Sequence, residues 1–164
     1  KREWQLSTIQ LDFNLPERFN MSYVGEDGKN HTPYIIHRAT FGSIERFTGV
    51  WLEHIQGVIP TWLSPVQVAL LPIADRHAEA AQKINSELIK IGIRSEVNAK
   101  QETLQSKIRE ATLQKVPFMG IIGDKEMAQK EHTLSVRTRE GKDLGQLNLS
   151  HFLVKVKEEI DKKA

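Results

Sequence analysis

The stretch VQVALLPIADRHAEAAQKINSELIKIGIRSEV, residues 66–97, decides the fold class of this 164-residue chain. Residues 66–73 form a short, nearly continuous apolar run, which is typical of a buried strand. Apolar residues then recur at helical spacing; Asp75 is placed to cap this helix and Gly92 to end it. A second strand is expected at 93–97. A strand, a helix and a strand in succession predict a layered α/β domain with parallel pairing.

The same alternation continues towards the C-terminus. The expected elements are, in order, a helix capped by Thr103 and ended at Pro117, strands at 118–122 and 133–139, a turn at 141–145 and a final helix opened by Ser150. These elements predict a mixed, mostly parallel sheet flanked by helices.

The first part of the chain has a different rhythm. Apolar residues alternate with polar ones around Gln10, which predicts a half-buried strand, and a short helical turn is expected near Pro16. An antiparallel hairpin is expected next, with strands at 22–24 and 33–38 joined through an Asp-Gly turn.

A helix then begins after Ser43, a capping residue, and ends at Gly57. The proline-bearing connector that follows predicts two domains, residues 1–62 and 63–164.

Composition excludes some kinds of site. The chain has no cysteine, so no disulfide framework forms and no thiolate zinc site is completed by this chain alone. The 23 basic and 21 acidic residues give a net charge of +2, which alone does not indicate nucleic-acid binding. No apolar run approaches the roughly 18 residues of a membrane span, so no membrane partner is expected.

Several residues of the first part are candidates for chemistry. His37 lies on a predicted strand, where a structural histidine is more common than a metal ligand. Arg46, in the first turn of a helix, is either a solvated side chain oriented by Glu45 or a guanidinium that packs on a flat ring or binds phosphate. Gln5 and Gln10 either face water from an edge strand or hydrogen-bond a ligand.

In the second part, Arg137 and Arg139 share one strand face because side chains repeat every two residues. They form either a solvated sheet face or a surface that contacts RNA. The turn beginning at Gly123 follows a buried strand, and ligands often bind at the carboxyl end of a strand in an α/β sheet.

Four blocks in this order closely resemble the threonyl-tRNA synthetase family: REWQLSTIQLDFNLPERF, YVGEDGK, HRATFGSIERFTG and IREATLQKVPFMGIIGDKE. The resemblance covers essentially the whole chain, and GSIERF is similar to motif 3 of class II synthetases. It implies the C-terminal piece of an antiparallel-sheet catalytic domain followed by an anticodon-binding domain. The implied activity is ATP-dependent activation of threonine and its transfer to threonine tRNA, in a cytoplasmic homodimer.

The resemblance also implies residue roles in the catalytic part. His37 is similar to one ligand of a Zn²⁺ that recognises threonine, and a site built to bind a hydroxyl rejects an analogue without one. Arg46 resembles the arginine that packs against ATP, with Glu45 and Ser43 beside it. Gln5 is implied in nucleotide binding, and Gln10 in binding threonine and in catalysis. ATP is a substrate that comes with Mg²⁺.

Anticodon reading is implied for residues at Gln101, Arg109, Glu126 and Arg137. The family commonly has an Arg-Asn pair where this chain has Lys100-Gln101, and lysine lacks the bidentate fork of arginine.

Motifs 1 and 2 and the other zinc ligands are not in these residues. We therefore expect a fragment that does not form threonyl-adenylate by itself and whose own role is anticodon recognition.

Two alternatives stand beside the ligase. One is a non-catalytic tRNA- or RNA-binding module built on the same anticodon-binding fold. The other is a sister synthetase for proline, glycine or histidine. Retention of the residues implied in catalysis disfavours the module, and His37 disfavours the sister enzymes.

Overall fold

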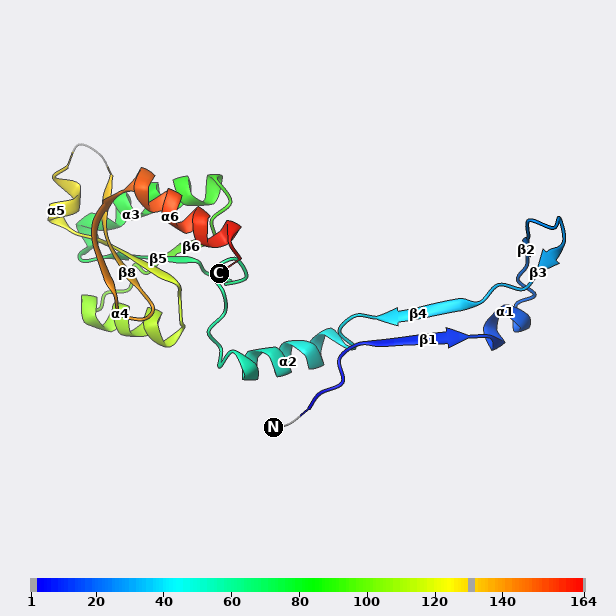
Figure 1. The fold of residues 1–164 in the computed structure, drawn as a ribbon. Coiled ribbons are helices and arrows are strands. Elements are labelled where there is room, and N and C mark those ends of the chain that lie inside the picture. Colours follow the sequence, from blue (N-terminus) through cyan, green and yellow to red (C-terminus); the bar gives the residue numbers. More distant parts are fainter. Residues whose placement is uncertain (1–2, 130–131, 164) are drawn as a thin grey trace. The chain divides into compact units, whose positions relative to one another are not determined.

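A computed structural model describes residues 3–129 and 132–163. The chain divides into two compact units, residues 1–56 and 57–164, coloured blue to cyan and cyan to red in Figure 1. The domain boundary expected after residue 62 stays a prediction. No helix within the described ranges is long and apolar enough to cross a membrane.

The first unit contains a two-stranded antiparallel sheet. Strand β1 (Thr8–Asp12) pairs with β4 (Ile35–Ala39), which places Gln10 opposite His37. Helix α1 (Asn14–Arg18) follows β1, as the predicted helical turn requires. Helix α2 (Ile44–His54) follows β4 and is capped by Ser43, whose Oγ accepts from the Arg46 amide at 3.1 Å.

The predicted hairpin in this unit is wrong. Strand β2 (Tyr23–Val24) pairs with β3 (Asn30–His31), whereas β4 pairs with β1. The chain reverses sharply because Gly28 adopts a φ of +71° and the Gly25 amide donates to the Lys29 carbonyl at 2.8 Å. The first residues after this turn therefore meet β2, and the later ones reach β1.

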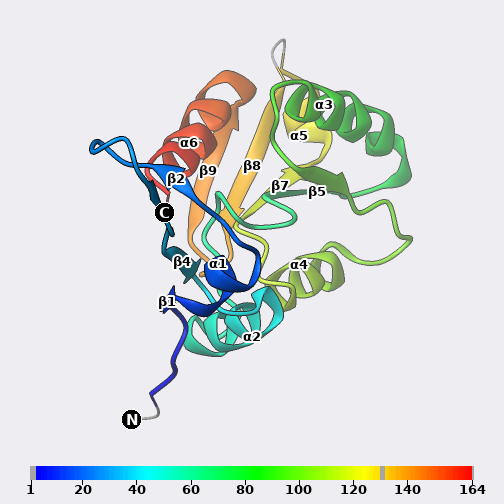
Figure 2. The ribbon, with the colours of Figure 1, turned by 90° about the vertical axis from the view of Figure 1, so that its right-hand side faces the viewer.

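The second unit is built on a mixed sheet flanked by helices, as predicted. The sheet has five strands, one more than expected, and its pairing is parallel in one half and antiparallel in the other, not mostly parallel. Strand β5 (Val68–Pro72) is parallel to both of its neighbours, β6 and β7, and β8 is antiparallel to both β7 and β9 (Figure 2). The other strands are β6 (Ser95–Val97), β7 (Phe118–Ile122), β8 (Thr133–Thr138) and β9 (Asp143–Asn148). The two central parallel strands are fully buried, which explains their continuous apolar sequence.

Helices cover both faces of this sheet (Figure 1). Helices α3 (Ala78–Lys90) and α6 (Leu149–Asp161) pack on one face, where Leu70 and Phe118 lie in the core. Helix α4 (Leu104–Leu113) packs on the other face against Leu71 and Met119. A 3₁₀ turn, η1 (Asp75–His77), precedes α3, and the short helix α5 (Asp124–Met127) follows β7.

Three details of the predicted second unit are wrong. The turn expected at 141–145 overlaps β9, because Gly145, at φ +75°, lies within the strand beside a register shift in its pairing. Asn148, not Ser150, caps α6, and its Oδ1 accepts from the His151 amide at 2.9 Å. Asp75 does not cap α3, because it lies in the 3₁₀ turn that precedes the helix. In that turn His77 Nδ1 accepts from the Ala74 amide.

Candidate functional site

The carboxyl ends of β5 and β7 form a topological switch point. The chain leaves β5 through α3 on one face of the sheet to reach β6, and returns through α4 on the other face to β7. The two connections diverge, so the ends of β5 and β7 are flanked by different helices, and such a point is where open α/β sheets bind ligands.

Two of the residues implied in anticodon reading lie at this edge. Glu126 is in α5, just beyond β7, and Gln101 follows β6. The side-chain Nε2 of Gln101 lies 3.5 Å from Oδ2 of Asp75, which is in the turn after β5. The loops after β5 and β6 therefore meet there.

The Glu126 carboxylate is tightly held. It is 7% exposed and accepts from the Gly123 amide at 2.9 Å, from Ser135 Oγ at 2.8 Å and from Gln146 Nε2 at 2.9 Å. Burial raises the pKa of Glu126, but the hydrogen bonds from Gln146, Ser135 and Gly123 outweigh burial and leave its pKa below the usual value. The carboxylate is therefore a fixed acceptor.

Arg137 lies on the same sheet face as Ser135, beside this carboxylate. Its guanidinium is half-exposed and forms a long ion pair, 3.4 Å, with Asp143 across the β8–β9 ladder. Exposed pairs of this kind contribute little to stability, so the guanidinium can exchange Asp143 for an RNA oxygen at small cost.

Arg109 is exposed on α4, the helix that covers the sheet face on which Arg137 lies opposite Met119. It lines a hollow together with Lys100, Glu102 and Ser106. Lys100 forms an ion pair with Glu110 of α4, which raises the pKa of the lysine. The structure thus brings Gln101 and Glu126 to the carboxyl edge of the sheet. Arg137 lies further along β8, opposite Met119 near the amino end of β7, and Arg109 lies beside Lys100.

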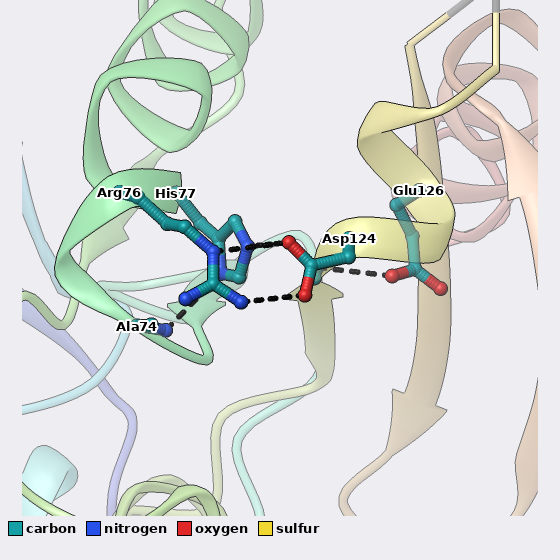
Figure 3. A network of polar contacts seen from close by, with 6 residues as sticks. Ala74, Arg76, His77, Asp124 and Glu126 are labelled. Atoms are coloured by element: carbon teal, nitrogen blue, oxygen red, sulfur yellow. Dashed lines mark hydrogen bonds and ion pairs between the residues drawn. The ribbon is translucent and has the colours of Figure 1, made fainter.

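Sequence reasoning missed one network at the switch point (Figure 3). Asp124, the first residue of α5, accepts from Arg76 Nε at 3.0 Å and Arg76 Nη2 at 2.6 Å, and it lies 2.9 Å from His77 Nε2. The bonds to Arg76 and His77 hold the pKa of Asp124 well below its usual range. The sequence carries no local signal for this network, because Arg76 and His77 lie 48 and 47 residues from Asp124.

In the first unit, the pairing of β1 with β4 brings Gln10 and His37 to one sheet face. His37 Nε2 lies 3.1 Å from Oδ2 of Asp12, whose other oxygen caps α1 by accepting from the Asn14 and Leu15 amides. These bonds, the Leu15 amide first, lower the pKa of Asp12. A shallow hollow lies between Gln10, Asp12 and His37.

Arg46 behaves differently from one expectation. Its guanidinium lies over the ring of Trp4, 5.5 Å from the centroid, and forms no ion pair with Glu45 within the described residues. The reason is geometric, because consecutive residues of a helix do not face each other. The guanidinium packs on an indole of this chain, and its contact with a ligand stays a prediction. Gln5 lies before β1 and is exposed.

The comparisons with known proteins identify the class of domain to which this fold belongs. The family model described as the anticodon binding domain matches residues 67–159, and the chain belongs to this family. A second model, the tRNA synthetase class II core domain (G, H, P, S and T), matches residues 1–55.

The relatives are more specific. The chain is 54% identical over 162 residues to the threonine–tRNA ligase of Aquifex aeolicus (strain VF5), which covers 99% of this chain and 25% of that protein. It is 47% identical over 159 residues to the enzyme of the same name from Thermotoga neapolitana, and this match covers 97% of this chain and 24% of that protein. The resemblance to threonyl-tRNA synthetases is confirmed. The chain spans about a quarter of the length of these curated relatives.

Solved structures agree. The RNA binding domain of threonyl-tRNA synthetase from Cryptosporidium parvum Iowa II matches with a TM-score of 0.85 at 37% identity, covering 97% of this chain and 40% of that one. A putative threonyl-tRNA synthetase from Aeropyrum pernix matches with a TM-score of 0.67 at 34% identity, covering 99% and 39%.

Proposed function

We propose that this chain is the C-terminal part of a threonine–tRNA ligase and that its second unit reads the anticodon of threonine tRNA. The observation that carries the proposal is the identity of about half of all residues with threonine–tRNA ligases across both units. The site supports it, because a fixed acceptor at the switch-point edge, Glu126, and an exchangeable arginine on β8, Arg137, suit the unstacked bases of an RNA loop.

The proposed division of labour is simple. The Glu126 carboxylate, which is 7% exposed, accepts a further hydrogen bond from a base amino or imino group in addition to its three internal ones, and Gln101 offers both a donor and an acceptor. Arg137 binds a base edge or phosphate after leaving Asp143, and Arg109 contacts the RNA from α4.

The first unit contributes part of an active site in this proposal. Gln5, Ser43, Glu45 and Arg46 contact ATP, and Gln10 contacts threonine and acts in catalysis. Arg46 would exchange the Trp4 ring for the flat face of adenine, since guanidinium groups stack on both. Ser43 contributes mainly by capping α2, the helix that carries Arg46.

A Zn²⁺ ligand role is proposed for His37. The residues fit: the half-exposed imidazole already bonds a carboxylate, Asp12, and a carboxylate partner orients a metal-binding histidine. The described residues contain no group of three His, Asp or Glu side chains placed for a metal, so further ligands come from elsewhere in the ligase. When bound, the metal would supply a Lewis acid for recognition of threonine, and His37 would hold it. Mg²⁺ with ATP, a homodimer and a cytoplasmic location belong to the same proposal.

Binding of a threonine tRNA anticodon stem–loop tests the proposal. Wild type and Arg137→Ala are compared at two salt concentrations, with a hairpin of altered loop sequence as competitor and Arg18→Ala as the control variant. Arg137→Ala is expected to lose about 1–3 kcal/mol of binding and its preference for the correct loop. Equal, purely salt-dependent binding of both hairpins by wild type would refute anticodon reading.

A further inference from the structure

Arg76 is the most firmly held exposed arginine at the switch point. Both ends of its fork bind Asp124, through Nε to Oδ1 at 3.0 Å and Nη2 to Oδ2 at 2.6 Å, while its side chain remains 66% exposed (Figure 3). A bidentate pair fixes the plane of a guanidinium as well as its position.

A buried histidine, His77, also bonds to the Asp124 carboxylate of this pair. His77 is 1% exposed, and its Nδ1 accepts from the Ala74 amide at 3.1 Å. The other ring nitrogen, Nε2, therefore carries the proton that is donated to Asp124 Oδ1 at 2.9 Å. His77 therefore links the turn after β5 to the start of α5, which follows β7. This link fixes the position of Asp124, and Asp124 in turn fixes Arg76.

This arginine also lies between two of the proposed anticodon readers. Asp75, the residue before Arg76, lies with its Oδ2 3.5 Å from Nε2 of Gln101. Asp124, which pairs with Arg76, is the first residue of the helix that carries Glu126. The exposed guanidinium of Arg76 therefore lies between the loop that carries Gln101 and the helix that carries Glu126.

The charge balance favours one kind of RNA contact. Asp124 neutralises Arg76 locally, which weakens its attraction for a phosphate but leaves both faces of the guanidinium plane unchanged. Proteins that recognise single-stranded RNA stack unpaired bases on such planes.

We propose that Arg76 is a further RNA-binding residue: its guanidinium, fixed by Asp124 and His77, is a platform on which an unstacked base of the anticodon loop lies. This inference rests on the proposed anticodon reading. Asp124 and His77 are positioning residues in it.

The test uses the full chain and the anticodon stem–loop of threonine tRNA, with affinity measured over a series of salt concentrations. Arg76→Lys keeps the charge and loses the plane, Arg76→Ala loses both, and Asp124→Asn releases the arginine. Arg18→Lys is the matched control, and thermal unfolding shows that each variant folds.

Arg76→Lys and Arg76→Ala are both expected to weaken binding by about 5- to 150-fold, as for loss of one stacked base, with the salt dependence unchanged. Asp124→Asn is expected to weaken binding by less.

Wild-type affinity of Arg76→Lys, together with a salt slope that falls by about 0.7 in Arg76→Ala, would replace stacking by a phosphate contact and overturn the inference. Wild-type affinity of both Arg76 variants would leave the network a purely structural one and also overturn it. Arg137→Ala, measured alongside, separates the two claims: if it loses loop preference while the Arg76 variants do not, anticodon reading stands and the platform falls.

Discussion

Glu126 joins three parts of the second unit through one carboxylate. Its oxygens accept from the loop after β7, from β8 and from β9, so removing the charge affects the whole edge. Hydrogen bonds to a buried charged group contribute more than neutral ones, because the group has lost its water. The same bonds that suit RNA reading therefore also stabilise the unit.

This arrangement predicts a pH-dependent stability. Native pKa values of Glu126 and Asp124 lie below their unfolded values, about 4.3 and 3.9. Their stabilisation is therefore fully present above those unfolded values and is lost as pH falls through the lower native ones. Glu126→Gln is expected to cost about 1.5–3 kcal/mol at pH 7.

Urea unfolding at pH 7 and pH 3 checks this prediction. The deficit of Glu126→Gln is expected to shrink at pH 3, below the unfolded pKa of glutamate, because the unfolded wild-type chain is protonated there and the advantage of the native carboxylate falls. Glu87→Gln, an exposed change on α3, serves as the control and is expected to behave like wild type. A deficit equal at both pH values would contradict a role for the ionised carboxylate.

At the scale of elements, the segment from Gly57 to β5 belongs to the second unit. Arg94 donates to the Ser64 carbonyl at 2.9 Å and the Trp62 carbonyl at 2.8 Å, and Arg139 donates to the Ile59 carbonyl at 2.6 Å. Buried Gln67 adds a bond to the Thr61 carbonyl at 2.9 Å. This apparent connector is tied to the domain by side chains of residues that directly flank β6, β8 and β5.

Arg94→Ala is expected to loosen this segment. Two hydrogen bonds of about 1 kcal/mol each correspond to a roughly 30-fold rise in local opening. Limited proteolysis with chymotrypsin, followed at the bond after Trp62, measures the opening. Arg18→Ala, in the first unit, is the control, and equal cleavage rates in the two variants would show that Arg94 does not hold the segment.

At the scale of the whole chain, burial differs sharply between the units. Pro16 is the one buried residue among residues 3–56, whereas strands β5 and β7 of the second unit are buried throughout. Apolar residues of the first sheet, such as Ile9, Leu11 and Ile36, are more than half exposed. Two strands with no core are marginally stable in water.

Hydrogen exchange of the 164-residue chain is expected to show this difference. Amides of β1 and β4 should exchange about 100-fold or more faster than those of β5 and β7, because local opening of a unit without a core is nearly free. The internal control is β7 in the same molecule. Strong protection of residues 4–14 would mean that the first unit is stable by itself.

Local patterns determined much of the fold in advance. Ser43 and Thr103 cap helices as expected, because a cap depends on residues only three positions away. The buried strands β5 and β7 were visible as continuous apolar runs. Strand β9 was missed, because it lies at the sheet edge, is half-exposed and contains a glycine.

Pairing and side-chain partners depended on long-range contacts. Nothing local says that residues 35–39 pair with β1 rather than with residues 23–24, since both choices satisfy the same alternation. Arg46 contacts Trp4 and not Glu45, and Asp124 contacts Arg76 and His77. These partners are distant in sequence and meet only after folding, so no local pattern predicts them.

The sequence by itself determined the α/β class, the helices and central strands, and the likeness to threonyl-tRNA synthetases, since each depends on local spacing or on long matching blocks. Only the tertiary structure decided which residues meet at the switch point, where β5 and β7 end. The physical reason is that strand order and the direction of each crossover bring Gln101, Arg76, Asp124 and Glu126 together, and neither property is encoded in any short stretch of the chain.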